Sequence, residues 1–249
     1  MPQGKFYTQD YTGETISQNV SWKDRNNPDS MIWVEKTIFN HEHDSVAHVI
    51  GNSKSREDFD VRLLDGQTGG SAGVRSVGQT YGCNLLYKDY APDFLICTNR
   101  MICSEIAKDG YGKENIVFSN VKNILQHEGH FHLYPHFTPN NAGTLALKLA
   151  CADGHKKIFL VGMTTYSAPD DNIYYGSHDA YREVNVDGAN GKFIQDCARL
   201  FLLYDDVEFY FVCKDLGLMP EAYHWIPNVK EITKLQYYNL ASLGAIHHS

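Results

Sequence analysis

Four of the chain's twelve histidines lie within ten residues, in the stretch HEGHFHLYPH at 127–136. Histidine is the commonest metal ligand and titrates most easily near neutral pH. The stretch lacks the His-Glu-x-x-His spacing of a zinc protease helix. If it forms a strand, His130, His132 and His136 share one face. A zinc site is one interpretation. We favour an acid–base role for His136 or His132, and expect no metal site.

A second stretch, VIGNSKS at 49–55, places a short loop of small polar residues after an apolar run. Such a loop lets backbone N–H groups approach an anion, although a glycine turn after a strand is also an ordinary structural necessity. The glycine-rich DGQTGGSAG at 65–73 lacks the Gly-Lys-Ser/Thr ending of a P-loop, so we interpret it as a flexible connection. HEHD at 41–44 is interpreted as a polar turn.

Composition narrows the class of protein. The formal net charge of −8 argues against general nucleic-acid binding, which requires lysine and arginine. The six cysteines form no CxxC pair, which is typical of buried thiols in a reducing compartment. No apolar run has membrane-spanning length, and the first residues lack the apolar core of a signal peptide. We therefore expect a cytoplasmic protein without a membrane span.

The elements that must position these residues alternate along the chain. Apolar strand-like runs lie at 46–50, 79–87, 93–98, 115–119, 131–137, 156–162 and 207–213, and helix-like runs at 104–110, 143–154 and 192–204. This order predicts an α/β, Rossmann-like fold with a mostly parallel sheet and helices on both faces. We expect a polar N-terminal arm or hairpin over 1–44, with a strand at 31–39, and a nucleotide-binding domain over 45–249. Residues 163–190 are predicted to form a lid loop.

In such sheets, ligands bind beyond the carboxyl ends of the strands. The places to examine are therefore the loops after Ile50, Thr98 and Val161, and the helix that starts at Gly143.

Several motifs appear in a recognisable order. The loop Gly51-Asn52-Ser53-Lys54-Ser55 is followed by the pairs Cys83-Asn84 and Thr98-Asn99, and then by NAGTLALKLACADGHKKIFLVGMTTY at 141–166. Over residues 46–213 this order resembles the bacterial sialyltransferases and the related motility-associated-factor and pterin-pyrophosphokinase-like proteins.

The resemblance implies a nucleotide-activated sugar of the CMP type as donor and no required cofactor. Asn52, Ser55, Asn84 and Asn99 match positions that contact the nucleotide or the donor sugar, although strand-end capping is the alternative for Asn84 and Asn99. Ala142 and Gly143 would direct their N–H groups at its phosphate, and Tyr166 matches a tyrosine that helps the phosphate leave. The remaining positions assigned to the nucleotide site are Gly51, Ser53, Thr144, Gly162, Thr164, Tyr174 and Tyr175.

The chain also departs from that pattern. Where the sialyltransferases carry a general-base histidine, this chain has Gly188, Ala189 and Asn190, and Pro139 replaces an arginine near the acceptor. His178 lies in the same loop and is our candidate for a substitute base.

Three hypotheses follow. The first is a glycosyltransferase-like enzyme that transfers a sugar to a glycan or small-molecule acceptor. The second is a magnesium-dependent pyrophosphokinase-like enzyme, with Asp170, Asp171 and Asp187 as candidate ligands. The third is a nucleotide-binding accessory protein without catalysis, because the usual base and arginine are missing. An oligomer is compatible with each.

Overall fold

The computed structural model describes residues 20–23, 31–34, 45–57, 59–64, 78–134, 141–165, 169–181 and 186–246. The chain divides into two compact units. One comprises Met1–Glu42 and Cys97–Pro139, and the other comprises His43–Ile96 and Asn140–Ser249. The larger unit holds most of the strands and is described first.

Six strands of the larger unit form a parallel array. They are β3 (Val46–Ile50), β4 (Gln79–Cys83), β5 (Phe94–Ile96), β8 (Lys157–Val161), β9 (Glu208–Cys213) and β10 (Val229–Thr233), in the order β10-β9-β8-β3-β4-β5. Every pairing between neighbours is parallel. The predicted parallel sheet is therefore confirmed. β3 comes first of these six strands in the sequence but lies inside the array. β4 and β5 follow on one side of it, and β8, β9 and β10 lie on the other side.

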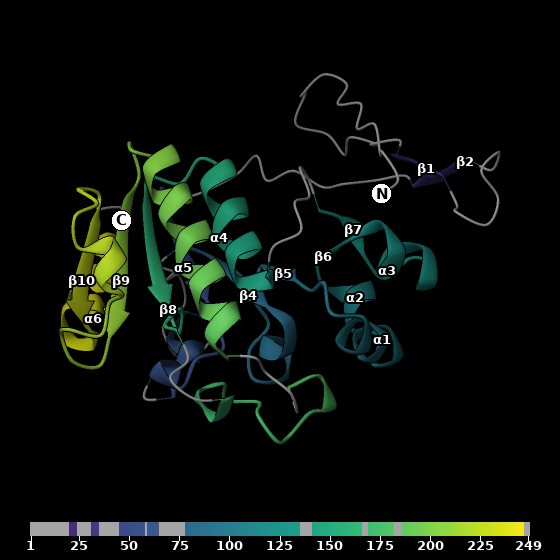
Figure 1. The fold of residues 1–249 in the computed structure, drawn as a ribbon, viewed down its shortest axis with the longest axis horizontal. Coiled ribbons are helices and arrows are strands. Elements are labelled where there is room, and N and C mark those ends of the chain that lie inside the picture. The colour runs from purple at the N-terminus through teal and green to yellow at the C-terminus, as the bar shows by residue number, and fades with distance from the viewer. Residues whose placement is uncertain are drawn as a thin grey trace. The chain divides into compact units, whose positions relative to one another are not determined.

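Helices cover both faces of this array. In Figure 1, α4 (Ala142–Ala152) and α5 (Val186–Leu203) run side by side in front of the strands. His48 of β3 points to the opposite face of the array. There its Nδ1 shares a hydrogen bond of 2.8 Å with the Tyr237 hydroxyl of α6 (Lys234–Ile246). Since side chains alternate along a strand, Ala47 and Val49 take the face of α4, which contacts β3. The predicted α/β fold class is confirmed.

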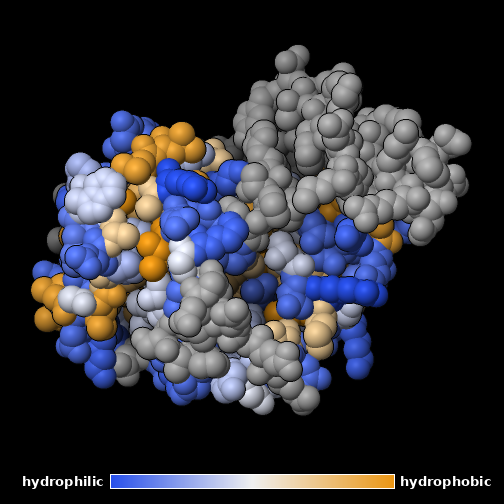
Figure 2. Space-filling model, viewed as in Figure 1, coloured by the Kyte–Doolittle hydropathy of each residue, from blue (hydrophilic) through white to orange (hydrophobic). Residues whose placement is uncertain are grey.

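The described residues of the larger unit also form six short 3₁₀ turns: Lys54–Arg56, Val61–Leu64, Asn84–Lys88, Pro169–Asp171, Asp179–Tyr181 and Glu221–Tyr223. The surface of the larger unit carries both polar and apolar side chains. Figure 2 shows apolar groups among the hydrophilic ones on this face. The exposed apolar side chains of the larger unit include Leu203 of α5 and Leu235 of α6. Among the described residues, no helix is long and apolar enough to cross a membrane.

In the smaller unit, the residues that the structure describes form two short pairs of strands. β1 (Val20–Lys23) and β2 (Met31–Val34) pair antiparallel, whereas β6 (Val117–Ser119) and β7 (His132–Leu133) pair parallel. Three helices accompany them: α1 (Arg100–Lys108), α2 (Tyr111–Glu114) and α3 (Val121–Gln126). On β7, Leu133 is fully buried and His132 half-buried, in the alternation expected for a strand.

Some predicted boundaries were wrong. The helix expected from 192 begins at Val186, so the end of the predicted lid loop is helical despite Gly188 and Gly191. Glycine lowers helix propensity, which is why the sequence did not predict this earlier start. The sequence also gave no expectation for β10 and α6. The strand predicted at 131–137 is described only as β7, and the stretches 41–44 and 65–73 lie outside the described residues.

Candidate functional site

The strand order creates a topological switch point at the carboxyl ends of the strands, next to β3. β3 lies between β4, which follows it in sequence, and β8, which belongs to the returning half of the chain. The connections leaving β3 and β8 therefore diverge to opposite sides. Open parallel sheets bind ligands at such a switch point, and a pocket of about 190 Å³ lies here.

Two glycines allow the loops after β3 and β8 to touch. Gly51 donates its N–H to the Val161 carbonyl at 2.8 Å, and Ser53 donates to the Gly162 carbonyl at 3.1 Å. A Cβ at Gly51 would lie 2.2 Å from the Gly162 oxygen, and Gly162 itself has φ of +64°. No side chain fits at either position without moving backbone. Both glycines line the pocket, so the contact between these two loops forms part of its wall.

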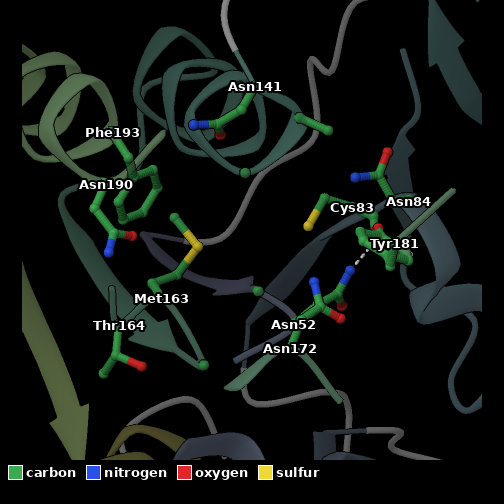
Figure 3. A pocket seen from close by; sticks show the side chains of 14 residues that line it. Asn52, Cys83, Asn84, Asn141, Met163, Thr164, Asn172, Tyr181, Asn190 and Phe193 are labelled. Atoms are coloured by element: carbon green, nitrogen blue, oxygen red, sulfur yellow. Dashed lines mark hydrogen bonds between the residues drawn. The ribbon is translucent and has the colours of Figure 1, made fainter. Parts of the chain in front are cut away.

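Two asparagine side chains place buried oxygen atoms at this pocket. Asn52, which is 3% exposed, donates its Nδ2 to the Cys83 carbonyl at 3.1 Å, as the dashed line in Figure 3 shows. Its Oδ1 is buried and has no hydrogen-bond partner among the described residues. The same holds for Oδ1 of Asn84, whose backbone has φ of +52°. Buried polar atoms are normally satisfied, so these two carbonyl oxygens fit donors of a bound ligand.

The first turn of α4 contributes backbone donors to the same pocket. Asn141 caps this helix, with its Oδ1 accepting from the Thr144 N–H at 2.8 Å. The N–H groups of Ala142 and Gly143, which both line the pocket, have no acceptor within the helix. A helix N-terminus with unused donors favours an anion such as phosphate.

A segment that is far from β3 in the sequence, residues 172–181, forms another wall of the pocket. Ile173 donates its N–H to the Asn52 carbonyl at 3.0 Å, and Ser53 forms an isolated antiparallel bridge with Asn172. This pairing brings Asn172 and Tyr181 to the pocket wall. Asn190 and Phe193 of α5, three residues apart and therefore on one helix face, complete it, as Figure 3 shows.

The described lining of the pocket carries no charged side chain. Of the described residues that line it, none is Asp, Glu, Lys, Arg or His. Burial raises the pKa of Cys83 to about 12, although Arg56 acts in the opposite direction, so this thiol stays protonated. Recognition here depends on amide groups, backbone N–H groups and apolar contacts. No described lining residue is a histidine, carboxylate or lysine, the usual acid–base groups.

A buried arginine lies behind the wall formed by the 172–181 segment. Arg56, which is 4% exposed, donates from Nη2 to Asp89 at 3.2 Å and to the Tyr174 hydroxyl at 3.1 Å. The Tyr174 hydroxyl in turn donates to Asp89 at 2.6 Å. Burial, and then the bond to Asp89, raise the pKa of Tyr174 above its ordinary range. This cluster fixes the segment that delivers Asn172 and Tyr181.

Seven of the residues predicted from sequence line the pocket: Gly51, Asn52, Asn84, Ala142, Gly143, Gly162 and Thr164. Their roles in nucleotide binding stay predictions. Seven further lining residues were not among the predicted site residues: Cys83, Asn141, Met163, Asn172, Tyr181, Asn190 and Phe193. Asn141 had a local signal, because an asparagine directly before an apolar helix is a common N-cap.

Other predicted residues lie elsewhere. Thr144 is fully buried in α4, and the Ser53 and Ser55 hydroxyls bond to Thr164 Oγ1, the latter at 3.0 Å. Tyr174 belongs to the buried cluster, whereas Tyr175 is 40% exposed. The Ser53 and Ser55 hydroxyls therefore position Thr164, which lines the pocket, but neither serine lines the pocket itself.

Asn99 lies in the smaller unit and caps α1. Its Oδ1 accepts from the backbone N–H groups of Met101 at 2.9 Å and Ile102 at 3.4 Å. This is the capping alternative considered from the sequence.

Of the predicted catalytic residues, His178 is described, and it is not among the described residues that line the pocket. His178 accepts at Nδ1 from the Ala180 N–H at 3.0 Å, and its ring neighbours that of Tyr181. Tyr166 and His136 lie outside the described residues. In the histidine-rich stretch, His127 Nε2 lies 3.1 Å from Ser104 Oγ. Within the described part of the chain, no group of three or more His, Cys, Asp or Glu could hold a metal ion.

No family model matches the chain, and no curated protein matches its sequence. Solved structures similar to it include the sialyltransferase CstII from Campylobacter jejuni with the substrate analogue CMP-3FNeuAc (14% identity, 68% of this chain, 82% of that chain, TM-score 0.43). Another is the same enzyme with cytidine-5'-monophosphate (13% identity, 70% and 82% coverage, TM-score 0.46). A variant with CMP covers 79% of this chain and 98% of that one, at 13% identity and a TM-score of 0.46. Similarity of this degree assigns no activity and no residue role.

Proposed function

We propose that the pocket at the switch point binds a nucleotide-activated sugar of the CMP type, and that the protein is a glycosyltransferase-like enzyme. The observation that carries the proposal is the meeting of two kinds of group in one pocket. Within the described part of the chain, the buried Oδ1 atoms of Asn52 and Asn84 have no hydrogen-bond partner, and the first turn of α4 offers backbone N–H groups.

The chemistry of a nucleotide matches both. A carbonyl oxygen accepts hydrogen bonds from the exocyclic amine of a base or from ribose hydroxyls. The N–H groups of Ala142 and Gly143 suit a phosphate. In sugar transfer the phosphate departs with negative charge, and donors fixed before the reaction stabilise that charge. The order of sequence motifs, with its resemblance to sialyltransferases, favours cytidine monophosphate as the leaving group.

A second candidate is a nucleotide-binding accessory protein without catalysis. It is favoured by the composition of the lining, because none of the described lining residues is a His, Asp, Glu or Lys, the usual general bases. The magnesium-dependent alternative finds less support. The carboxylate of Asp170 is paired with Lys54 at 3.1 Å, and no described residue that lines the pocket is a carboxylate.

The test is calorimetric titration with CMP, UMP, AMP and ATP, each with and without Mg²⁺. We expect CMP to bind without magnesium, and Asn52→Ala to weaken binding about tenfold, as for one lost hydrogen bond. Asn115→Ala is the matched control, because that amide bonds locally to the Tyr111 carbonyl. Failure of every nucleotide to bind, or an unchanged affinity in Asn52→Ala, would reject the proposal.

Turnover separates the first two candidates. The protein is incubated with a CMP-activated sugar and released CMP is measured. CMP release supports the transferase, whereas binding of CMP without any release across several donors and acceptors supports the accessory protein. A strict magnesium requirement for binding, with ATP preferred, would instead support the pyrophosphokinase-like enzyme.

A further inference from the structure

Two cysteines of the smaller unit touch each other through their sulfur atoms. Cys97 follows directly after β5 in the chain, and Cys103 lies in the first turns of α1. Their Sγ atoms are 3.3 Å apart, and both side chains are fully buried. The six cysteines are all free thiols. A disulfide bond needs the two sulfurs about 2.05 Å apart, so a movement of little more than 1 Å joins them.

The surroundings of Cys103 provide hydrogen bonds to its sulfur. The buried Asn123 amide donates from Nδ2 to Cys103 Sγ at 3.1 Å, and Ser119 Oγ lies 3.5 Å from the same sulfur. Contact with the Cys97 thiol lowers the pKa of Cys103; burial acts in the opposite direction, and Ser119 lowers the pKa further. The thiolate is the reactive form of cysteine, and donors of this kind stabilise it.

We propose that Cys97 and Cys103 form a reversible disulfide when the protein meets a peroxide. Cys103 is the attacking residue and Cys97 the resolving one. This site lies outside the proposed nucleotide pocket and does not depend on that function.

The reaction balances with hydrogen peroxide as the oxidant. The Cys103 thiolate attacks one peroxide oxygen, the O–O bond breaks, and hydroxide leaves, which produces a sulfenic acid. The Cys97 sulfur then attacks the Cys103 sulfur, the S–S bond forms, and the sulfenic hydroxyl leaves as water with the Cys97 proton. Two thiols lose two electrons in total, and one peroxide becomes two waters.

The new bond would act on a short loop. It would tie the residue after β5 to the first turns of α1, and the loop between them contains Thr98 and Asn99. Asn99 caps the helix, and the Thr98 carbonyl accepts from Asn123. Because both sulfurs are buried, oxidation requires a local opening of this region, which makes it slower than at an exposed thiol.

The sequence offers a direct assay. Arg100 lies between the two cysteines, so trypsin separates them into peptides 89–100 and 101–108, each with one cysteine. The full-length protein is treated with hydrogen peroxide, free thiols are alkylated after denaturation, and the digest is analysed without reduction by mass spectrometry. We expect the two peptides to appear joined, and their free thiols to be lost together and regained with dithiothreitol.

Cys83, Cys151, Cys197 and Cys213 are internal controls and should keep their free thiols at the same peroxide dose. Cys97→Ser should leave a sulfenic acid on Cys103 that dimedone traps, whereas Cys103→Ser should leave Cys97 unoxidised. The wild-type result stands even if a variant folds poorly. The proposal is overturned if the joined peptides do not form, or if Cys97 and Cys103 pair no more often with each other than with the remaining cysteines.

Discussion

The Tyr174 hydroxyl donates a hydrogen bond to the Asp89 carboxylate at 2.6 Å, and so links the 169–181 segment to the turn after β4. Arg56 completes the link from the turn after β3, donating to both partners. Three loops that leave different strands are thereby held together beside the pocket. The cluster gives the 172–181 wall a fixed position, although none of its three side chains lines the pocket.

Tyr174→Phe should loosen this wall. We expect a loss of about 1 kcal/mol in the free energy of unfolding, since the buried Tyr174 loses its hydroxyl bonds to Arg56 and to Asp89, whose side chain is 44% exposed. Amide hydrogen exchange should accelerate over 172–181, and nucleotide affinity should fall because Asn172 and Tyr181 belong to that wall. Tyr175→Phe is the control, as its side chain is 40% exposed. Equal exchange in wild type and Tyr174→Phe would contradict the positioning role.

Asn84→Gly removes the side-chain amide of Asn84 but preserves the backbone conformation at this position. It therefore tests the role of the side chain alone. Asn84 has φ of +52°, a conformation that glycine adopts without strain. We expect stability within about 1 kcal/mol of the wild type. If Oδ1 of Asn84 accepts from the ligand, CMP affinity should fall about tenfold, as for one lost hydrogen bond. Thermal unfolding and calorimetry of the same preparation check both parts. Unchanged affinity would exclude Asn84 from ligand contact.

Gly143→Ala tests how closely a ligand approaches α4. A Cβ at Gly143 would meet nothing closer than Asn141 Oδ1 at 3.4 Å, so the fold accepts it. Alanine is also the better helix former, and stability should be equal or higher. A phosphate at the first turn would meet the added methyl group, and affinity should fall. Wild-type affinity in a fully folded Gly143→Ala protein would argue against an anion at this helix end.

The parallel sheet was predictable because strands such as β8 contain an uninterrupted apolar run, here IFLV at 158–161. The edge strand β10 carries Lys230 and Glu231 in its middle, and charges of this kind are typical of edge strands. They remove the apolar signal, which is why the sequence gave no expectation there. The start of α5 was missed for a different reason, because Gly188 and Gly191 lower the helix propensity of its first turns.

The part of the site that follows strands directly was also predictable. Gly51, Asn52 and Gly162 come immediately after β3 and β8, and parallel strands bring such residues to one edge. Asn172 was not predictable in this way. It reaches the pocket through a bridge to Ser53, more than a hundred residues earlier in the chain, and no local pattern encodes such a contact.

Glu231 provides the last prediction, which concerns stability against pH. Its carboxylate accepts three backbone N–H bonds, from Gly217 at 2.8 Å and from Leu218 and Met219 at 2.7 Å each. Burial acts to raise the pKa of Glu231, but these donors outweigh it, and the pKa is lowered. A lowered pKa in the folded state means that the stabilisation is present above the unfolded value, about 4.3, and is lost as the pH falls through the folded value.

Glu231→Gln should therefore cost about 1 kcal/mol at pH 7, allowing for screening by solvent, because one amide oxygen cannot replace two carboxylate oxygens. The cost should shrink at a pH below the folded pKa, where the wild-type carboxyl is itself protonated. Urea unfolding of both proteins at neutral and acidic pH measures the difference, with the exposed Glu221→Gln as control. A cost that is the same at both pH values would show that the carboxylate charge does not hold the 217–219 loop.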